Sequence, residues 1–294
     1  MLEMDFLNLL KTKKIVMVDG AIGTQLELLG ATANSLSNIN APEILLDIHT
    51  AYIAAGSDAI ITNTFSENPI FATTHGSGFD VGHVNRIGVE IARKAADGKA
   101  AILGGVGATG QLLEPYGTYT EEQFYDASLE QARLLADAGV DAFILETISD
   151  LREALCVLRA CKENFKLPVI VSMTYATESE GGRTSMGNKA ADCARELEKA
   201  GADIIGINCG TIDHANTYKI VESYRSASAL PILVEPNAGK PRLDGDKTVY
   251  DMTPAEFAGI IRACIDAGAT IVGGCCGTTP DHIRAVAEMI GNAQ

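Results

Sequence analysis

The sequence lacks tryptophan, an excess of positive charge and any long apolar run. None of the 294 residues is Trp, and 23 Lys and Arg face 38 Asp and Glu, which gives a net charge of −15. Nothing in such a chain would neutralise a phosphate backbone, so nucleic acid is excluded as an expected partner. No stretch approaches the roughly 18 apolar residues of a membrane span. The N-terminus, MLEMDFLNLLKTKK, has no uninterrupted apolar segment like that of an export signal. We therefore expect a cytoplasmic protein without a membrane partner.

Proline is also scarce, with 9 residues against 29 Gly, and 47% of the chain is hydrophobic. These values are typical of an ordered globular protein. A rule of roughly 150 residues per domain would suggest two domains, but α/β barrels of about 250 residues or more form a single unit. The seven Cys are odd in number and scattered. In a reducing compartment this favours free or metal-bound thiols over disulfides.

Eight short runs rich in β-branched residues recur along the chain. Each run is apolar throughout rather than alternating, as in strands buried on both faces of a parallel sheet, and each is followed by enough chain for one helix. The pattern predicts a (β/α)8 TIM barrel, one domain over residues 1–294. An open doubly wound sheet is the alternative, but no Gly-rich dinucleotide fingerprint follows the first run. The runs are KIVMVDG, DAIITNTF, AAILGGVG, DAFILET, PVIVSMTY, DIIGINCG, PILVEPN and TIVGGCCG.

Segments with amphipathic helical spacing separate these runs. Four joints share one design, in which a Gly would end a helix just before a buried strand: Gly56, Gly139, Gly201 and Gly268. The expected helices cover 41–56, 84–98, 120–139, 151–164, 191–201, 216–227, 253–268 and 279–291.

Three of the seven Cys fall at the ends of predicted strands. Cys209 follows the sixth strand, and the adjacent Cys275 and Cys276 follow the eighth. The pair alone could be small buried hydrophobes, a vicinal disulfide or part of a metal site. In a barrel the chemistry gathers at the C-terminal strand ends, so the three thiols would share one rim. The other four Cys lie in predicted helices, where burial is the expected role.

Soft thiolates select zinc or a similar metal. Three protein ligands with an open position are typical of catalytic rather than structural zinc. Asn237 and Glu235 are the nearest other candidates and could cover the metal weakly, whereas His214 and His282 lie in or at helices and are not expected ligands. An all-thiolate site would host a further thiolate better than a hydroxide. The pattern therefore indicates transfer of an electrophile, most simply a methyl group, to a thiol.

At this point the residues resemble the homocysteine S-methyltransferase family, a zinc-dependent (β/α)8 barrel. The similarity covers nearly the whole chain and is carried by MVDGAIGTQL, GSDAIITNTF, DAFILET, IGINCG, VEPNAGKP and GGCCGTTPDHI. The resemblance implies that Cys209, Cys275 and Cys276 bind zinc, that the homocysteine sulfur takes the fourth position, and that methionine is the product. It also implies catalytic roles for Asp19 and Glu146 at the amino-acid end of the substrate. The implied substrate-binding residues are Gly20, Thr62, Asn63, Glu146, Asn208 and Asn237.

Methyl donors differ within this family. A betaine donor requires an aromatic cage, but the chain has no Trp, has Ser66 after Phe65 and has Thr147 after Glu146. TNTF, VEPNAGKP and KTVY instead resemble the homocysteine-binding domain of cobalamin-dependent methionine synthase, which implies a methyl-corrinoid donor. No D-x-H-x-x-G corrinoid signature is present. We therefore expect the donor on a separate corrinoid protein or on a missing corrinoid domain.

Two alternatives stay open. The donor could be S-methylmethionine or S-adenosylmethionine, which would need a sulfonium pocket. The chain could instead be a lyase or aldolase barrel in which the Cys site is structural, but no strand end carries the Lys that a Schiff base needs, and Lys240 lies beyond the seventh strand.

Overall fold

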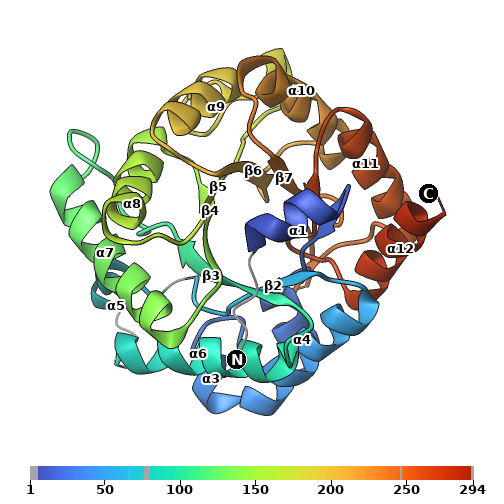
Figure 1. Cartoon of the computed structure of the whole chain (residues 1–294), viewed down its shortest axis with the longest axis horizontal. Helices are drawn as coiled ribbons and strands as arrows, with labels where there is room; N and C mark the ends of the chain where they lie inside the picture. Colours follow the sequence, from blue (N-terminus) through green and yellow to red (C-terminus); the bar gives the residue numbers. More distant parts are fainter. Residues whose placement is uncertain (1–5, 66, 76–79, 246, 293–294) are drawn as a thin grey trace.

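The computed structural model describes residues 6–65, 67–75, 80–245 and 247–292. Eight parallel strands run in the order β1-β10-β7-β6-β5-β4-β3-β2, and a ring of helices surrounds them, which confirms the predicted single-domain (β/α)8 barrel (Figure 1). Within those residues, no helix has the length and apolarity needed to cross a bilayer. The barrel strands are β1 (Val16–Met17), β2 (Ala59–Ile61), β3 (Ala101–Gly107), β4 (Ala142–Ile148), β5 (Val169–Met173), β6 (Ile204–Asn208), β7 (Ile232–Glu235) and β10 (Ile271–Val272).

The eight predicted helices are confirmed, with ends that shift by a few residues. They are α4 (Pro42–Ala55), α6 (Val81–Ala96), α7 (Glu121–Ala138), α8 (Leu151–Asn164), α9 (Ala190–Lys199), α10 (Thr217–Ala227), α11 (Pro254–Asp266) and α12 (Pro280–Gly291). The four joint glycines all have positive φ, from 91° to 116°, as a helix-ending Gly should. The sequence pattern did not predict α1 (Phe6–Thr12), α2 (Gly23–Leu28), α3 (Ser37–Asn40), α5 (Pro69–His75) and the hairpin of the exposed β8 (Arg242–Asp244) with β9 (Lys247–Val249).

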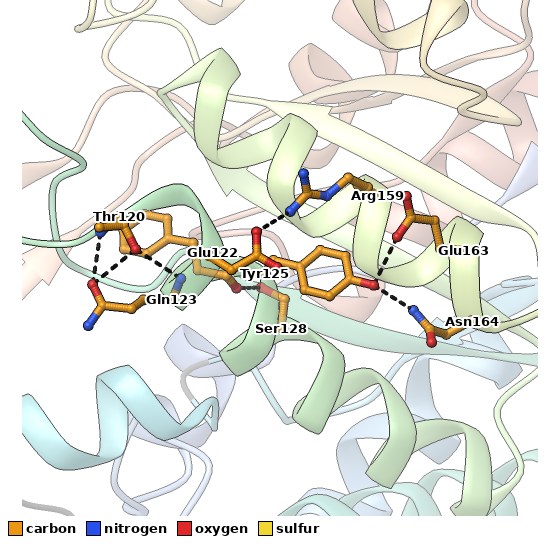
Figure 2. A network of polar contacts seen from close by, with 9 residues as sticks. Thr120, Glu122, Gln123, Tyr125, Ser128, Arg159, Glu163 and Asn164 are labelled. Carbon is orange, nitrogen blue, oxygen red and sulfur yellow. Dashed lines mark hydrogen bonds and ion pairs between the residues drawn. The ribbon is translucent and has the colours of Figure 1, made fainter.

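Neighbouring helices of the outer ring are held by polar contacts as well as apolar ones. Between α7 and α8, Arg159 donates to Glu122 at 3.0 Å, and the Tyr125 hydroxyl donates to Glu163 at 2.9 Å (Figure 2). Thr120 caps the start of α7 together with Gln123. These exposed contacts join α7 to α8 on the outside of the barrel.

Two apolar cores lie on either side of the sheet. The larger lies between strands and helices, and the smaller fills the barrel interior with side chains such as Leu103, Ile144 and Leu233. Helix α1 lies across the N-terminal end of the barrel and adds the buried Phe6 to this inner core (Figure 1). The opposite, C-terminal end is therefore the one left open for a site.

Side-chain carboxylates complete the barrel where β1 meets β2. Asp58 donates its backbone N–H to the Met17 carbonyl at 2.7 Å, and its carboxylate accepts the Met17 N–H at 3.0 Å. At the C-terminal ends of the same two strands, the Asp19 carboxylate accepts the Ile61 N–H at 3.1 Å. The same device recurs at two other joints, since Asp141 and Asp203 accept strand N–H groups at 2.7 and 2.8 Å.

Candidate active site

The C-terminal strand ends enclose a cavity of about 280 Å³. Among the described residues, its wall includes carboxylates, thiols, hydroxyls and amides but no Lys, Arg or His. Eight of the ten site residues expected from the sequence line it. They are Gly20, Thr62, Asn63, Glu146, Asn208, Cys209, Cys275 and Cys276.

The three predicted ligands form a compact thiol cluster. The Cys209 and Cys276 sulfurs are 4.0 Å apart, as are those of Cys275 and Cys276, and all three lie within 4.8 Å of one another. Tetrahedral zinc with Zn–S bonds of about 2.3 Å would separate its sulfurs by about 3.8 Å. The cluster therefore fits a thiolate-bound metal with little rearrangement.

The consecutive thiols converge because neither lies in a regular strand. Strand β10 ends at Val272, and a turn follows in which the Thr278 N–H donates to the Cys275 carbonyl at 3.1 Å. The Thr278 hydroxyl also donates to that carbonyl and accepts the Ala21 N–H, which ties the turn to the loop after β1. A Cβ on Gly277 would lie 2.3 Å from the Tyr250 ring, so only glycine fits this turn.

Hydrogen bonds among the three thiols stabilise a negative charge on one of them, Cys209. Hydrogen bonds from the Cys275 thiol and then the Cys276 thiol lower the pKa of Cys209, and the same bonds to Cys209 raise the pKa of both donors. Asn208 adds an N–H···S contact of 3.8 Å to Cys275. One sulfur is therefore ready to bind a cation before the others lose their protons.

The other candidate ligands lie outside this group. His282 caps α12 and contacts the Met252 carbonyl at 2.9 Å, and His214 is buried in a short 3₁₀ turn. Glu235 does not join the group of atoms within 4.8 Å of one another. Asn237 does not line the cavity, although it is hydrogen-bonded to Cys209; in the part of the chain that the structure describes, its buried side-chain oxygen has no partner.

Three carboxyl groups lie near one another, and one of them, Glu146, lies near the Cys209 thiol. Glu146 projects from β4, Glu235 from β7, and Asp19 follows β1. Burial raises the pKa of Glu146 to about 7, with a further contribution from the Cys209 charge. Burial also raises the pKa of Asp19 and Glu235 well above the ordinary values, and repulsion among the carboxylates adds to it.

Glycines make the room for these carboxyl groups. A Cβ on Gly105 would lie 3.1 Å from the Glu146 Oε1, and one on Gly273 would lie 3.3 Å from the Glu235 Cγ. Both glycines sit where the apolar interior of the barrel gives way to the cavity. At this level of the barrel, the inward-pointing side chains therefore change from apolar to polar.

Several residues expected to contact the substrate already form hydrogen bonds with other protein groups. Asp19 is 1% exposed and accepts from the Ile61 N–H, and its other oxygen has no partner among the described residues. The Thr62 hydroxyl accepts the Gly105 N–H at 3.0 Å and lies 2.7 Å from the Thr64 hydroxyl. Asn63 donates to the Asn34 carbonyl at 3.1 Å, which holds a loop at the cavity wall. Glu146 is the expected contact that remains without a hydrogen-bonding partner in the described structure and lines the cavity.

Other wall residues were not singled out by the sequence. Asn34 and Ser35 come from the long segment between β1 and α4, where no strand end or motif marks them. By contrast, Thr147 lies at the strand end where the sequence places site residues, and Phe65 follows two residues after Asn63; both line the cavity. Ser66 lies outside the described residues.

A barrel that brings three thiols and a carboxyl-lined cavity to one rim has the groups that a metal-assisted enzyme acting on a thiol would need. Residues 16–290 match the family described as homocysteine S-methyltransferase. The chain belongs to this family.

Named relatives agree with that assignment. The chain is 31% identical to methionine synthase of Mycobacterium tuberculosis over 99% of its own length, but spans only 26% of that protein. It is also 31% identical to methionine synthase of Mycobacterium leprae, and that match covers 96% of this chain and 25% of the relative. It is 30% identical to homocysteine S-methyltransferase YbgG of Bacillus subtilis, and the match covers 95% of this chain and 96% of the relative.

Solved structures give the same architecture. The metallated form of the homocysteine methyltransferase MmuM from Escherichia coli matches with a TM-score of 0.80 and 25% identity, over 96% of this chain and 98% of that one. The carboxyl transferase domain of Rhizobium etli pyruvate carboxylase, at 15% identity and a TM-score of 0.56, shares the fold alone.

Proposed function

We propose that this protein transfers a methyl group to the thiol of homocysteine, giving methionine, with zinc held by Cys209, Cys275 and Cys276. The observation that carries the proposal is the convergence of three sulfurs within 4.8 Å beside a carboxyl-lined cavity. A zinc ion bound there would lower the pKa of a fourth, incoming thiol and keep it as a thiolate at neutral pH.

The chain's own residues would orient that thiol. Glu146 lines the cavity and would pair with the substrate ammonium group, and the buried Asp19 would gain its negative charge only when such a cation is near. Held at both ends, the substrate presents its sulfur to the open rim. There a new S–CH3 bond forms as the bond between methyl and its donor breaks, and the thiol proton leaves to solvent.

We propose a methyl-corrinoid as donor, carried by a separate protein or domain, and a cytoplasmic location. The similarity to two methionine synthases, of which this chain spans about a quarter, supports the donor. A sulfonium donor is the second candidate. The absence of Lys, Arg and His from the described cavity wall favours it, because a cationic donor would meet no repulsion.

The test is a methyl-transfer assay with purified protein and homocysteine, in which methylcobalamin, S-methylmethionine, S-adenosylmethionine and betaine are offered separately and zinc is counted. Methionine formed from methylcobalamin, with about one zinc per chain, would support the proposal. Methionine formed only from a sulfonium compound would keep the thiol chemistry and replace the donor. Zinc-free protein that methylates homocysteine at the full rate would overturn the role of the thiol cluster.

A further inference from the structure

Strand β4 contains an irregularity beside the key carboxylate. Its pairing with β5 shifts register between Leu145 and Ile148, so Glu146 and Thr147 lie in a bulge. Thr147 has a φ of +61°, a conformation that β-branched residues rarely adopt. Bulges near active sites redirect a side chain, and here the redirected neighbour is Glu146. Some other group must hold Thr147 in this strained conformation.

The side-chain amide of Asn208 is that group. Its Oδ1 accepts the Thr147 N–H at 2.9 Å, and its Nδ2 donates to the Thr147 hydroxyl at 2.7 Å. The Ser172 hydroxyl donates to the same Oδ1 at 2.7 Å, which fixes the amide from the strand between β4 and β6. Asn208 is 1% exposed, so this hydrogen-bonding capacity is spent on protein atoms.

The same amide also reaches the thiol cluster. Its Nδ2 lies 3.8 Å from the Cys275 sulfur. Asn208 ends β6, and the next residue, Cys209, also has a positive φ, of +52°. One buried side chain therefore contacts the bulge that carries Glu146 and one thiol, and is joined through the backbone to a second thiol.

We propose that Asn208 is a positioning residue that aligns the ammonium-binding carboxylate with the thiol cluster, rather than a direct substrate contact. It acts on Glu146 by holding Thr147 in the left-handed conformation, and on the cluster by donating to Cys275. The proposal rests on the proposed function, since homocysteine is the substrate whose two ends would be aligned.

The test separates the two actions. In Asn208→Ala, Thr147 loses its two hydrogen bonds with the amide. We expect the KM for homocysteine to rise about tenfold or more, because the Thr147 N–H is then unpaired and its φ is still strained. Adding Thr147→Gly should return the KM to within about threefold of wild type, since glycine adopts positive φ freely. Adding Thr147→Ala should give no rescue, because alanine removes the same hydroxyl without that freedom.

Zinc affinity, measured by competition with a chelator, reports the second action without turnover. We expect Asn208→Ala to weaken it about tenfold, as loss of a group supporting a metal ligand does. Thr147→Gly should not restore it, because the contact with Cys275 is still missing.

Asn85→Ala is the matched control. Asn85 is a buried amide that donates to the Glu67 and Val81 carbonyls, both at 2.9 Å, and it does not line the cavity. Its loss should lower the free energy of unfolding while leaving both the KM and zinc affinity at wild-type values.

An unchanged KM in Asn208→Ala, or equal rescue by the Gly and Ala changes, would overturn the positioning of Glu146. An unchanged zinc affinity would overturn the link to the cluster. If the wild-type protein does not methylate homocysteine, the proposed function fails instead, and zinc affinity alone then decides whether Asn208 supports the thiols.

Discussion

Replacing Glu146 with Gln gives a direct test of the ammonium site. The change keeps the shape of the side chain and removes its charge, so the variant imitates the protonated wild type. Burial raises the pKa of Glu146 from 4.5 to about 7. At about 1.36 kcal/mol for each pH unit, holding the charge in place costs about 3 kcal/mol. A substrate ammonium group would recover part of that cost.

The expected effect depends on pH in a defined direction. Above pH 7 the wild-type carboxylate is charged, and Glu146→Gln should lower kcat/KM for homocysteine about tenfold to hundredfold, because partial exposure reduces the gain. Below pH 7 the wild-type side chain becomes protonated and neutral, so the two proteins should converge. The ratio of their kcat/KM values cancels the titration of the substrate, which both proteins share.

The assay follows kcat/KM for homocysteine and for 4-mercaptobutanoate, which lacks the amino group, from about pH 6 to about pH 8.5. Glu146→Gln should lose its preference for homocysteine while binding zinc normally. Glu153→Gln is the control, because Glu153 is 5% exposed, accepts from Thr109 at 2.7 Å and lies outside the cavity. A ratio that does not change with pH, or an undiminished preference for the amino group, would refute the ammonium-binding role.

Three further results are expected. Cys276→Ser should lose zinc and methyl transfer together, as elemental analysis and the methyl-transfer assay would show; full activity without metal would contradict thiolate activation. Gly105→Ala would place a Cβ 3.1 Å from the Glu146 Oε1 and should raise the KM for homocysteine about tenfold, whereas an unchanged KM would mean that the carboxylate has room to move. Asp58→Ala would leave the Met17 N–H without its carboxylate and should lower the free energy of unfolding in urea by about 1–3 kcal/mol, with kcat unchanged; wild-type stability would show that the backbone bond alone closes the barrel.

The sequence was sufficient for features that depend on periodicity and on local chain geometry. The eight buried strands, their helices and the helix-ending glycines such as Gly139 follow from patterns that each occupy a few residues. The meeting of Cys209 with Cys275 and Cys276 was also predictable, because barrel topology brings the ends of strands six and eight to one rim.

Features that depend on contacts between distant segments were not predictable. Asn34 reaches the cavity wall because Asn63 holds its loop there with a hydrogen bond. Nothing in the sequence around either residue indicates that the two are partners. The left-handed Thr147 contradicts local propensity and is stable only with Asn208, 61 residues later. Helix α1 is too short for its pattern to show that it covers the barrel end.

Charge explains why the thiols and carboxyl groups belong to one site. Burying Asp19, Glu146 and Glu235 near three thiols is unfavourable in the protein alone, since burial and mutual repulsion raise the pKa of all three carboxyl groups. A divalent cation among the sulfurs and an ammonium group at Glu146 would each relieve part of that repulsion. The proposed metal and substrate should strengthen each other's binding through sulfur, because the homocysteine thiolate would take the metal's open position while Glu146 holds the ammonium group of the same molecule. A thiol without an amino group would bring no positive charge to Glu146, so we expect the acidic cavity to favour an amino-acid thiol.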